Sequence, residues 1–121
     1  TASTDNQYRK PASSMAPRRW RLFHDLLEAD LSDTPSIGRM AQELGLSGSF
    51  FIRAFSAATG STPHAYSIRR RINEARTKLL NPTASITHIA AETGFASQAH
   101  MTTVFREQLG VTPRHYRQIV S

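Results

Sequence analysis

The chain has 121 residues, 39% of them hydrophobic, and its 15 Lys and Arg residues against 9 Asp and Glu residues give a formal net charge of +6. It contains no cysteine, which excludes disulfides and zinc-thiolate sites. No apolar run approaches the roughly 20 residues that a membrane-spanning helix needs. We therefore expect a soluble, cytoplasmic protein of one small domain or two very small helical subdomains.

The positive charge is unevenly distributed. Residues 1–33 contain equal numbers of basic and acidic side chains, so the whole excess lies in residues 34–121. A local excess of this kind suits a polyanion such as duplex DNA, although a merely soluble basic surface would have the same charge.

Residues 1–17 are polar, small and without apolar periodicity, which is typical of a flexible arm or an interdomain linker. The chain begins with Thr rather than Met. We therefore expect it to be a piece of a longer polypeptide, with residues 18–121 forming the domain.

Residues 18–62 are predicted to form three helices. An apolar stripe defines the first helix, and Ser36 and Ser47 are suitable N-caps for the second and third. Gly45 ends the second helix, and Gly60 follows the third where a left-handed C-cap is needed. The inward-facing positions are expected to be Trp20, Phe23, Leu27 and Leu31, then Ile37, Met40, Ala41 and Leu44, then Phe51, Ala54, Phe55 and Ala58.

A longer helix is predicted over residues 63–81, beginning at Thr62-Pro63 and ending before Asn81-Pro82. The same signals then recur in residues 82–121: Ser85 and Ser97 as caps, Gly94 and Gly110 as turns, and Thr112-Pro113 as the start of the last helix. The sequence thus predicts an all-α fold of seven helices.

An internal repeat relates the two halves of this pattern. An offset of 50 residues relates Ser47, Phe55, Gly60, Pro63 and Tyr66 to Ser97, Phe105, Gly110, Pro113 and Tyr116. Before the turn the offset is 49, and it relates Ile37, Met40, Ala41 and Gly45 to Ile86, Ile89, Ala90 and Gly94. The second turn is therefore one residue longer than the first.

A short helix, a glycine turn and a second short helix make a helix-turn-helix unit, whose second helix enters the major groove of DNA. Two homeodomain-like units, residues 18–62 and 82–121, would be joined by the long helix at 63–81. They could present two recognition helices to successive major grooves, about 34 Å apart. Duplicated helical hairpins also build protein-interaction scaffolds, and the local positive charge favours DNA over that alternative.

The second unit carries a specific signature. It consists of Ser85-Ile86-x-x-Ile89-Ala90-x-x-x-Gly94-Phe95, then Phe105-Arg106, then Gly110-x-Thr112-Pro113-x-x-Tyr116-Arg117. Over residues 18–117 the chain resembles the AraC/XylS family of transcription regulators. It departs from the family pattern at His88, where Glu is frequent, and at Met101, where Phe is frequent and where we expect only a change of packing.

The resemblance implies a bacterial transcription regulator that binds double-stranded promoter DNA in the nucleoid and, as an activator, recruits RNA polymerase. An N-terminal part outside this sequence would then hold any effector site and the dimer interface. The alternative is a basic helical protein-interaction module without sequence readout. The operator, the regulated genes, the effector and the sign of regulation lie outside the sequence.

The exposed face of the first recognition helix is predicted to contain Ser49, Ile52 and Arg53, where the resemblance also places base contacts. Arg53 can donate two hydrogen bonds to guanine, and Ile52 can touch a thymine methyl. A phosphate contact or a solvated charge is the alternative for Arg53.

In the second recognition helix the predicted base contacts are Gln98, Ala99, Thr102 and Thr103. Gln98 can pair with adenine through two hydrogen bonds, whereas the other three offer methyl contacts or single hydrogen bonds. We therefore expect the first unit to discriminate more strongly per base than the second.

Phosphate contacts are expected from helix N-termini and from polar or basic side chains near them. These candidates are Ser36, Arg39, Ser47, Ser85, Ser97, His100 and Arg106. Arg69, Arg70 and Arg71 cannot all face one duplex, because consecutive helical residues point about 100° apart, so we expect at least one to be solvated or ion-paired.

Other chemistry finds little support in the sequence. The five histidines do not fall at metal-ligand spacing, and the chain has no nucleophile elbow or glycine-rich phosphate loop. We expect no metal, no cofactor and no enzymatic activity.

Overall fold

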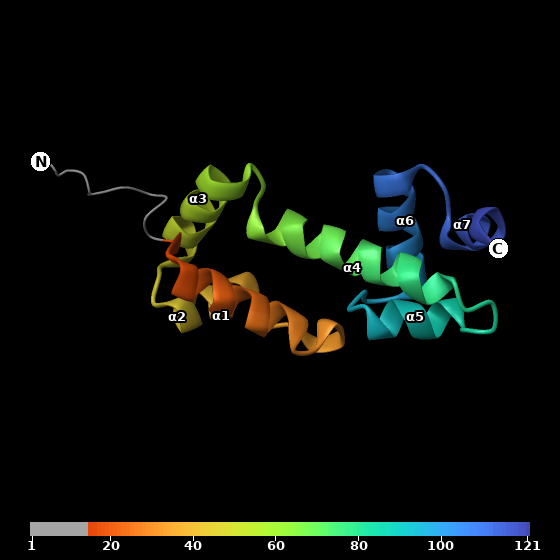
Figure 1. Cartoon of the computed structure of the whole chain (residues 1–121), viewed down its shortest axis with the longest axis horizontal. Helices are drawn as coiled ribbons and strands as arrows, with labels where there is room; N and C mark the ends of the chain where they lie inside the picture. The colour runs from red at the N-terminus through yellow and green to blue at the C-terminus, as the bar shows by residue number, and fades with distance from the viewer. Residues whose placement is uncertain (1–14) are drawn as a thin grey trace, which may run out of the picture. The chain divides into compact units, whose positions relative to one another are not determined.

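The computed structural model describes residues 15–121, which form seven α-helices, one short 3-10 helix and no strand (Figure 1). The all-α fold and its seven helices are therefore as predicted. Most of the predicted arm, residues 1–14, lies outside the described residues. The described chain divides into two compact units, one of residues 15–30 and 34–66, the other of Leu31–Asp33 and Ser67–Ser121.

The first unit contains α1 (Pro17–Glu28), α2 (Ile37–Leu44) and α3 (Gly48–Thr59) (Figure 1). Its core is built around aromatic rings: Phe23 and Phe55 are fully buried with ring centroids 5.0 Å apart, in an edge-to-face arrangement. Trp20 packs 5.2 Å from Phe55. Met15 is also buried, so burial begins before residue 18, where the sequence placed the start of the domain.

The predicted caps and turns of this unit are confirmed. Ser36 and Ser47 accept hydrogen bonds from the backbone N–H groups three residues later. Gly45 has φ 76° and Gly60 has φ 79°, a left-handed conformation that glycine adopts without the steric cost of a Cβ.

Two positions differ from the prediction. Leu31 was expected on the stripe of the first helix, but α1 ends at Glu28 and Leu31 lies in the 3-10 helix Leu31–Asp33, which belongs to the second unit. Ala58 was expected to face inward but is exposed, because the core of the unit stops at Phe55, one turn before the C-terminal end of α3. In both cases the apolar spacing of a helix continues in the sequence past the last residue that neighbouring elements bury.

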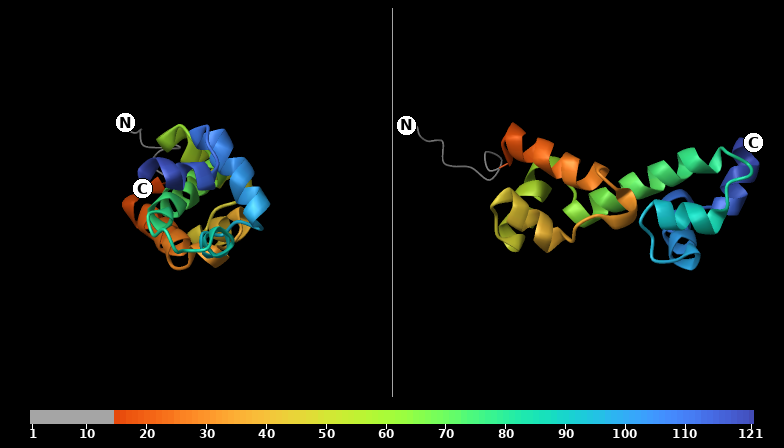
Figure 2. Two further views of the ribbon diagram at one scale, coloured as in Figure 1. Left: turned by 90° about the vertical axis from the view of Figure 1, so that its right-hand side faces the viewer. Right: turned by 90° about the horizontal axis from the view of Figure 1, so that it is seen from below.

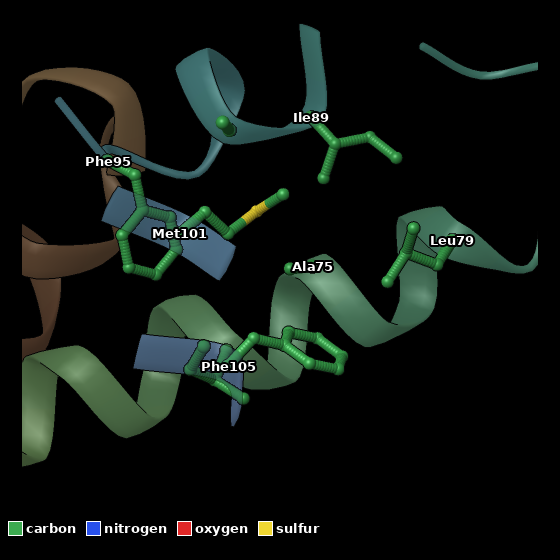
Figure 3. Packing of buried hydrophobic residues seen from close by; sticks show 8 residues of the cluster. Ala75, Leu79, Ile89, Phe95, Met101 and Phe105 are labelled. Carbon is green, nitrogen blue, oxygen red and sulfur yellow. The ribbon is translucent and has the colours of Figure 1, made fainter. Parts of the chain in front are cut away.

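The second unit contains the C-terminal part of α4 (Pro63–Leu79), which crosses the boundary at residue 66, together with α5 (Ile86–Glu92), α6 (Gln98–Leu109) and α7 (Pro113–Val120). Figure 2 shows the last three helices gathered around that part of α4. Their buried core consists of Ile72, Ala75, Leu79, Ile89, Ala90, Phe95, Met101 and Phe105 (Figure 3).

Local chemistry begins and ends these helices as the repeat predicts. Ser85, Ser97 and Thr112 each accept a backbone N–H at the N-terminus of their helix. Met101 is fully buried in the core of this unit, where a flexible methionine fills irregular space well. No helix in residues 15–121 is both long enough and apolar enough to cross a bilayer.

Candidate nucleic-acid interface

The first helix-turn-helix consists of α2, the turn at Gly45 and α3. The N–H of Gly45 donates to the carbonyls of Ala41 and Gln42, and Ser47 then caps α3. Contacts between α1, α2 and α3 hold this arrangement together within the unit. The second helix of the motif is thereby fixed with one face in the core and the other in solvent.

The predicted reading residues lie together on the solvent face of α3. Ser49, Ile52 and Arg53 are exposed, whereas Phe51 and Phe55 are completely buried. Positions 49, 52 and 53 share one stripe because residues three and four apart are neighbours on a helix. Ile52 is 40% exposed, which is a large exposed fraction for an isoleucine and leaves its methyl groups available to an apolar partner.

Phe50 supports Arg53. The guanidinium carbon of Arg53 lies 5.8 Å from the centroid of the Phe50 ring, which is within the range of a cation–π contact. Phe50 itself is half-buried. The aromatic ring therefore offers the exposed arginine a contact on its own helix.

The second helix-turn-helix is built from α5, a turn through Thr93 and Gly94, and α6. Thr93 is buried, and its hydroxyl donates to the carbonyl of Ile89 at 2.7 Å. Gly94 has φ 88°, and a Cβ there would meet the carbonyl oxygen of Leu31 and lie 2.8 Å from Nε of Arg71. The hydrogen bond of Thr93 thus closes the last turn of α5, and the glycine at position 94 permits the close approach of the Leu31 backbone.

The solvent face of α6 carries three of the four predicted residues of the second unit. Ala99 and Thr103 are exposed and Thr102 is half-buried, while Met101 and Phe105 are buried on the other side. The Thr103 hydroxyl donates to the carbonyl of Ala99 at 3.1 Å, so the side chain offers DNA its methyl group and an acceptor lone pair.

Arg106 lies on the same stripe. It is exposed and follows Ala99, Thr102 and Thr103 at the next position of the helical repeat. The second unit therefore has a cation on its reading face, one turn further along the helix than Arg53 in the first unit.

Gln98 is half-buried at the start of α6, and its side-chain oxygen accepts a hydrogen bond of 2.5 Å from the Thr87 hydroxyl on α5. Thr87 was not among the residues selected from the sequence. Only its position two residues after the Ser85 cap, on the helix that precedes Gln98, could have suggested the contact.

The residues predicted for phosphate contact lie at helix N-termini or on exposed faces. Ser36, Ser47, Ser85 and Ser97 use their oxygens to cap helices and retain a hydroxyl hydrogen that can be donated. The exposed ring of His100 packs against Phe95 with centroids 5.6 Å apart.

Arg39 is exposed and forms an ion pair with Glu43 of the same helix, with 3.1 Å between Nε and the carboxylate oxygen. A phosphate at this position would compete with Glu43 for the guanidinium. Because exposed ion pairs of this kind are weak, the competition costs little.

The three consecutive arginines of α4 have different surroundings. Arg70 forms an ion pair with Glu74 at 3.0 Å, so at least one of the three is ion-paired, as expected. Burial lowers the pKa of the Arg71 guanidinium from its ordinary value. Arginine nevertheless remains protonated in proteins, so the lowered pKa does not remove its charge.

In residues 15–121, no three His, Cys, Asp or Glu side chains are arranged to hold a metal ion. His88 lies at ion-pair distance from Glu92, with 3.2 Å between its Nε2 and the carboxylate oxygen. This pair is exposed and lies within one helix.

The chain is similar in sequence to a known domain family and to known transcriptional regulators. A family described as a helix-turn-helix domain matches residues 40–119. The chain is 38% identical over 103 residues to the HTH-type transcriptional regulator ExsA of Pseudomonas aeruginosa, covering 83% of this chain and 35% of that protein. It is 37% identical over 92 residues to the HTH-type transcriptional activator RhaS of Escherichia fergusonii, covering 76% and 33%. The chain thus spans about a third of the length of these relatives.

Solved structures resemble the fold as well. A transcriptional regulator from Chromobacterium violaceum, described as an AraC-type DNA-binding domain-containing protein, matches with TM-score 0.76 and 28% identity over 86% of this chain and 93% of that one. The DNA-binding domain of the global transcriptional factor AdpA, solved with a target DNA, matches with TM-score 0.71 and 28% identity over 92% and 93%.

Proposed function

This chain belongs to the AraC/XylS family as a DNA-binding domain, and from that premise we propose that it binds promoter DNA sequence-specifically, through its two recognition helices α3 and α6. The relatives are named as transcriptional regulators or activators.

The observation that carries the proposal is the stripe on α3. Three side chains of different chemistry, a hydroxyl, an apolar methyl group and a guanidinium, share one exposed face of a helix whose other face is fully buried. The major groove offers partners for each: acceptors and donors on base edges, thymine methyl groups, and the O6 and N7 acceptors of guanine. We assign Arg53 to guanine and Ile52 to a thymine methyl group, with Ser49 as a single hydrogen-bonding reader.

In the second unit, Gln98, Ala99, Thr102 and Thr103 would contact bases through smaller groups. Phosphate contacts from Ser36, Arg39, Ser47, Ser85, Ser97, His100 and Arg106 would fix the register on the duplex without carrying sequence information. With α3 and α6 in successive major grooves, one chain would read a site that two separate helix-turn-helix domains otherwise read.

The proposal also covers the organisation of the chain and its role in transcription. We assign residues 15–62 and 82–121 to the two helix-turn-helix units and 63–81 to the connection between them. We propose that the protein activates transcription, which agrees with the name of the RhaS relative. Contact with RNA polymerase, and dimerisation through an N-terminal part outside this sequence, belong to the same proposal. Binding to promoter DNA would place the protein in the cytoplasm, at the nucleoid.

The test is selection of bound sequences from a random duplex pool, followed by salt titrations on a selected and a scrambled duplex. We expect the logarithm of the binding constant to fall linearly with the logarithm of salt concentration for both. We also expect the selected duplex to bind roughly 10³-fold or more tightly. Equal affinity for both duplexes would contradict sequence readout and favour the protein-interaction module.

A further inference from the structure

The contact between Thr87 and Gln98 has consequences for which base the second unit reads. Gln98 borders two open hollows: one is also lined by Thr87 and by Arg114 of α7, the other by Thr102 of the reading face. Gln98 therefore lies at the surface beside the reading face, although it is half-buried.

The hydrogen bond fixes the orientation of the carboxamide. A glutamine amide has one accepting oxygen and one donating NH2 group at opposite corners of the same plane. Because the oxygen accepts from the Thr87 hydroxyl, that corner is held toward α5 with one of its two lone pairs occupied, and the NH2 group is the corner directed away from Thr87. A glutamine that reads adenine needs both corners, since adenine presents an acceptor at N7 and a donor at N6. Guanine presents two acceptors, at N7 and O6.

The repeat supplies an internal comparison. Subtracting the offsets of 49 and 50 places Gly38 at the position of Thr87 and Gly48 at the position of Gln98. The first unit thus lacks both partners, and the second unit has both. Neither glycine is required by crowding, since a Cβ at Gly48 would meet no atom within 4 Å and one at Gly38 would meet only the Ser36 oxygen at 4.0 Å.

We propose that Thr87 is a specificity-determining positioning residue, which holds Gln98 as a hydrogen-bond donor so that the second unit favours guanine over adenine at one base pair. The inference rests on the proposed function and revises the adenine pairing expected for Gln98 from the sequence. Thr87 acts through Gln98 and needs no contact with DNA.

The experiment measures the affinity of the 121-residue chain for four duplexes that differ only at the base pair whose readout is lost in Gln98→Ala. Wild type should prefer guanine. Thr87→Val, which keeps the shape and removes the hydroxyl, should reduce the ratio of guanine to adenine affinity by about three- to tenfold, the range of a single hydrogen bond. Thr87→Ser should retain the ratio, and Thr87→Val in the Gln98→Ala background should have no effect on it.

Three results would overturn the inference: a preference for adenine in wild type, an unchanged ratio in Thr87→Val, or a Thr87→Val effect that persists without Gln98. A gain-of-function variant covers the case in which Thr87→Val fails to fold. Gly38→Thr with Gly48→Gln should create a new guanine preference in the first unit, more strongly than Gly48→Gln alone. Wild type without selectivity at any base pair would instead refute the proposed function itself.

Discussion

Each recognition helix carries a guanidinium on its solvent face, but at positions that the repeat does not equate. The offset of 50 relates Arg53 to Thr103, and it relates Arg106 to Ser56. Arg53 lies in the N-terminal half of α3, where helices of this motif contact base edges, whereas Arg106 lies one turn later. The two arginines are therefore expected to differ in what they contact.

We predict that Arg53→Ala costs about 1–3 kcal/mol of binding free energy at one base pair and relaxes selectivity there, because it removes two hydrogen bonds to guanine. Arg106→Ala should weaken binding to all duplexes nearly equally and reduce the salt slope by about 1, as the loss of a phosphate contact does. Affinities for single-base variants of the selected site, measured at several salt concentrations, separate the two outcomes.

Arg18→Ala is the matched control, since it removes one exposed positive charge from α1 and leaves α3 and α6 intact. Little change in selectivity or in the salt slope is expected. If Arg53→Ala behaves like Arg106→Ala, with a uniform loss across all sequences, Arg53 contacts phosphate and the guanine assignment is wrong.

The sequence could predict which residues face solvent on α3, because Phe51 and Phe55, one helical turn apart, face the core and leave the opposite stripe exposed. It could not predict the contact of Thr87 with Gln98, or that of Arg53 with Phe50. The former depends on how two helices pack across a turn, and the latter on a side-chain rotamer. Helical periodicity specifies neither.

At the scale of elements, the helix ends were the most predictable features, because caps and glycine turns are local chemistry. Leu31 and Ala58 show where this predictability stops. Leu31 continues the spacing of Leu27 by four residues, yet the helix ends before it. Whether an apolar residue is covered depends on the neighbouring elements, which the spacing does not contain.

Gly94 and Gly110 allow a matched test of two effects of glycine. Both have positive φ, but a Cβ at Gly110 would meet no atom within 4 Å, whereas one at Gly94 would overlap the carbonyl oxygen of Leu31. We predict that Gly110→Ala costs about 1–2 kcal/mol of unfolding free energy, the backbone penalty alone. Gly94→Ala should cost clearly more, because backbone must also shift.

Urea unfolding followed by circular dichroism measures both variants. Similar midpoints for Gly94→Ala and Gly110→Ala would show that the approach of Leu31 to the turn does not contribute to stability, and the packing of the 3-10 helix against α5 would then be unimportant.

At the scale of the whole molecule, the duplication produces two hydrophobic cores, each assembled around its own helix-turn-helix. The repeat offsets predicted this duplication, because the same core, turn and cap positions recur. They could not predict that Leu31–Asp33 would join the second unit, since nothing in the repeat corresponds to that segment.

Because each unit has its own core, we predict that they can be destabilised separately. Phe51 and Phe105 are both fully buried, one in each unit. Truncation of either to Leu should lower the free energy of unfolding of its own unit by about 0.5–3 kcal/mol, so we expect both variants to fold. Trp20, the single tryptophan, belongs to the first unit, so its fluorescence reports that unit, while circular dichroism reports both.

Phe51→Leu should lower the midpoint of the fluorescence transition, and Phe105→Leu should leave that midpoint unchanged while shifting part of the circular dichroism transition. Each variant should also weaken sequence readout mainly in the half-site of its own unit, because a loosened core no longer holds its recognition helix in one orientation. Coincident shifts of both probes in both variants would mean that the continuous helix α4 couples the two cores into one cooperative unit. Readout by α3 and α6 would then be lost together.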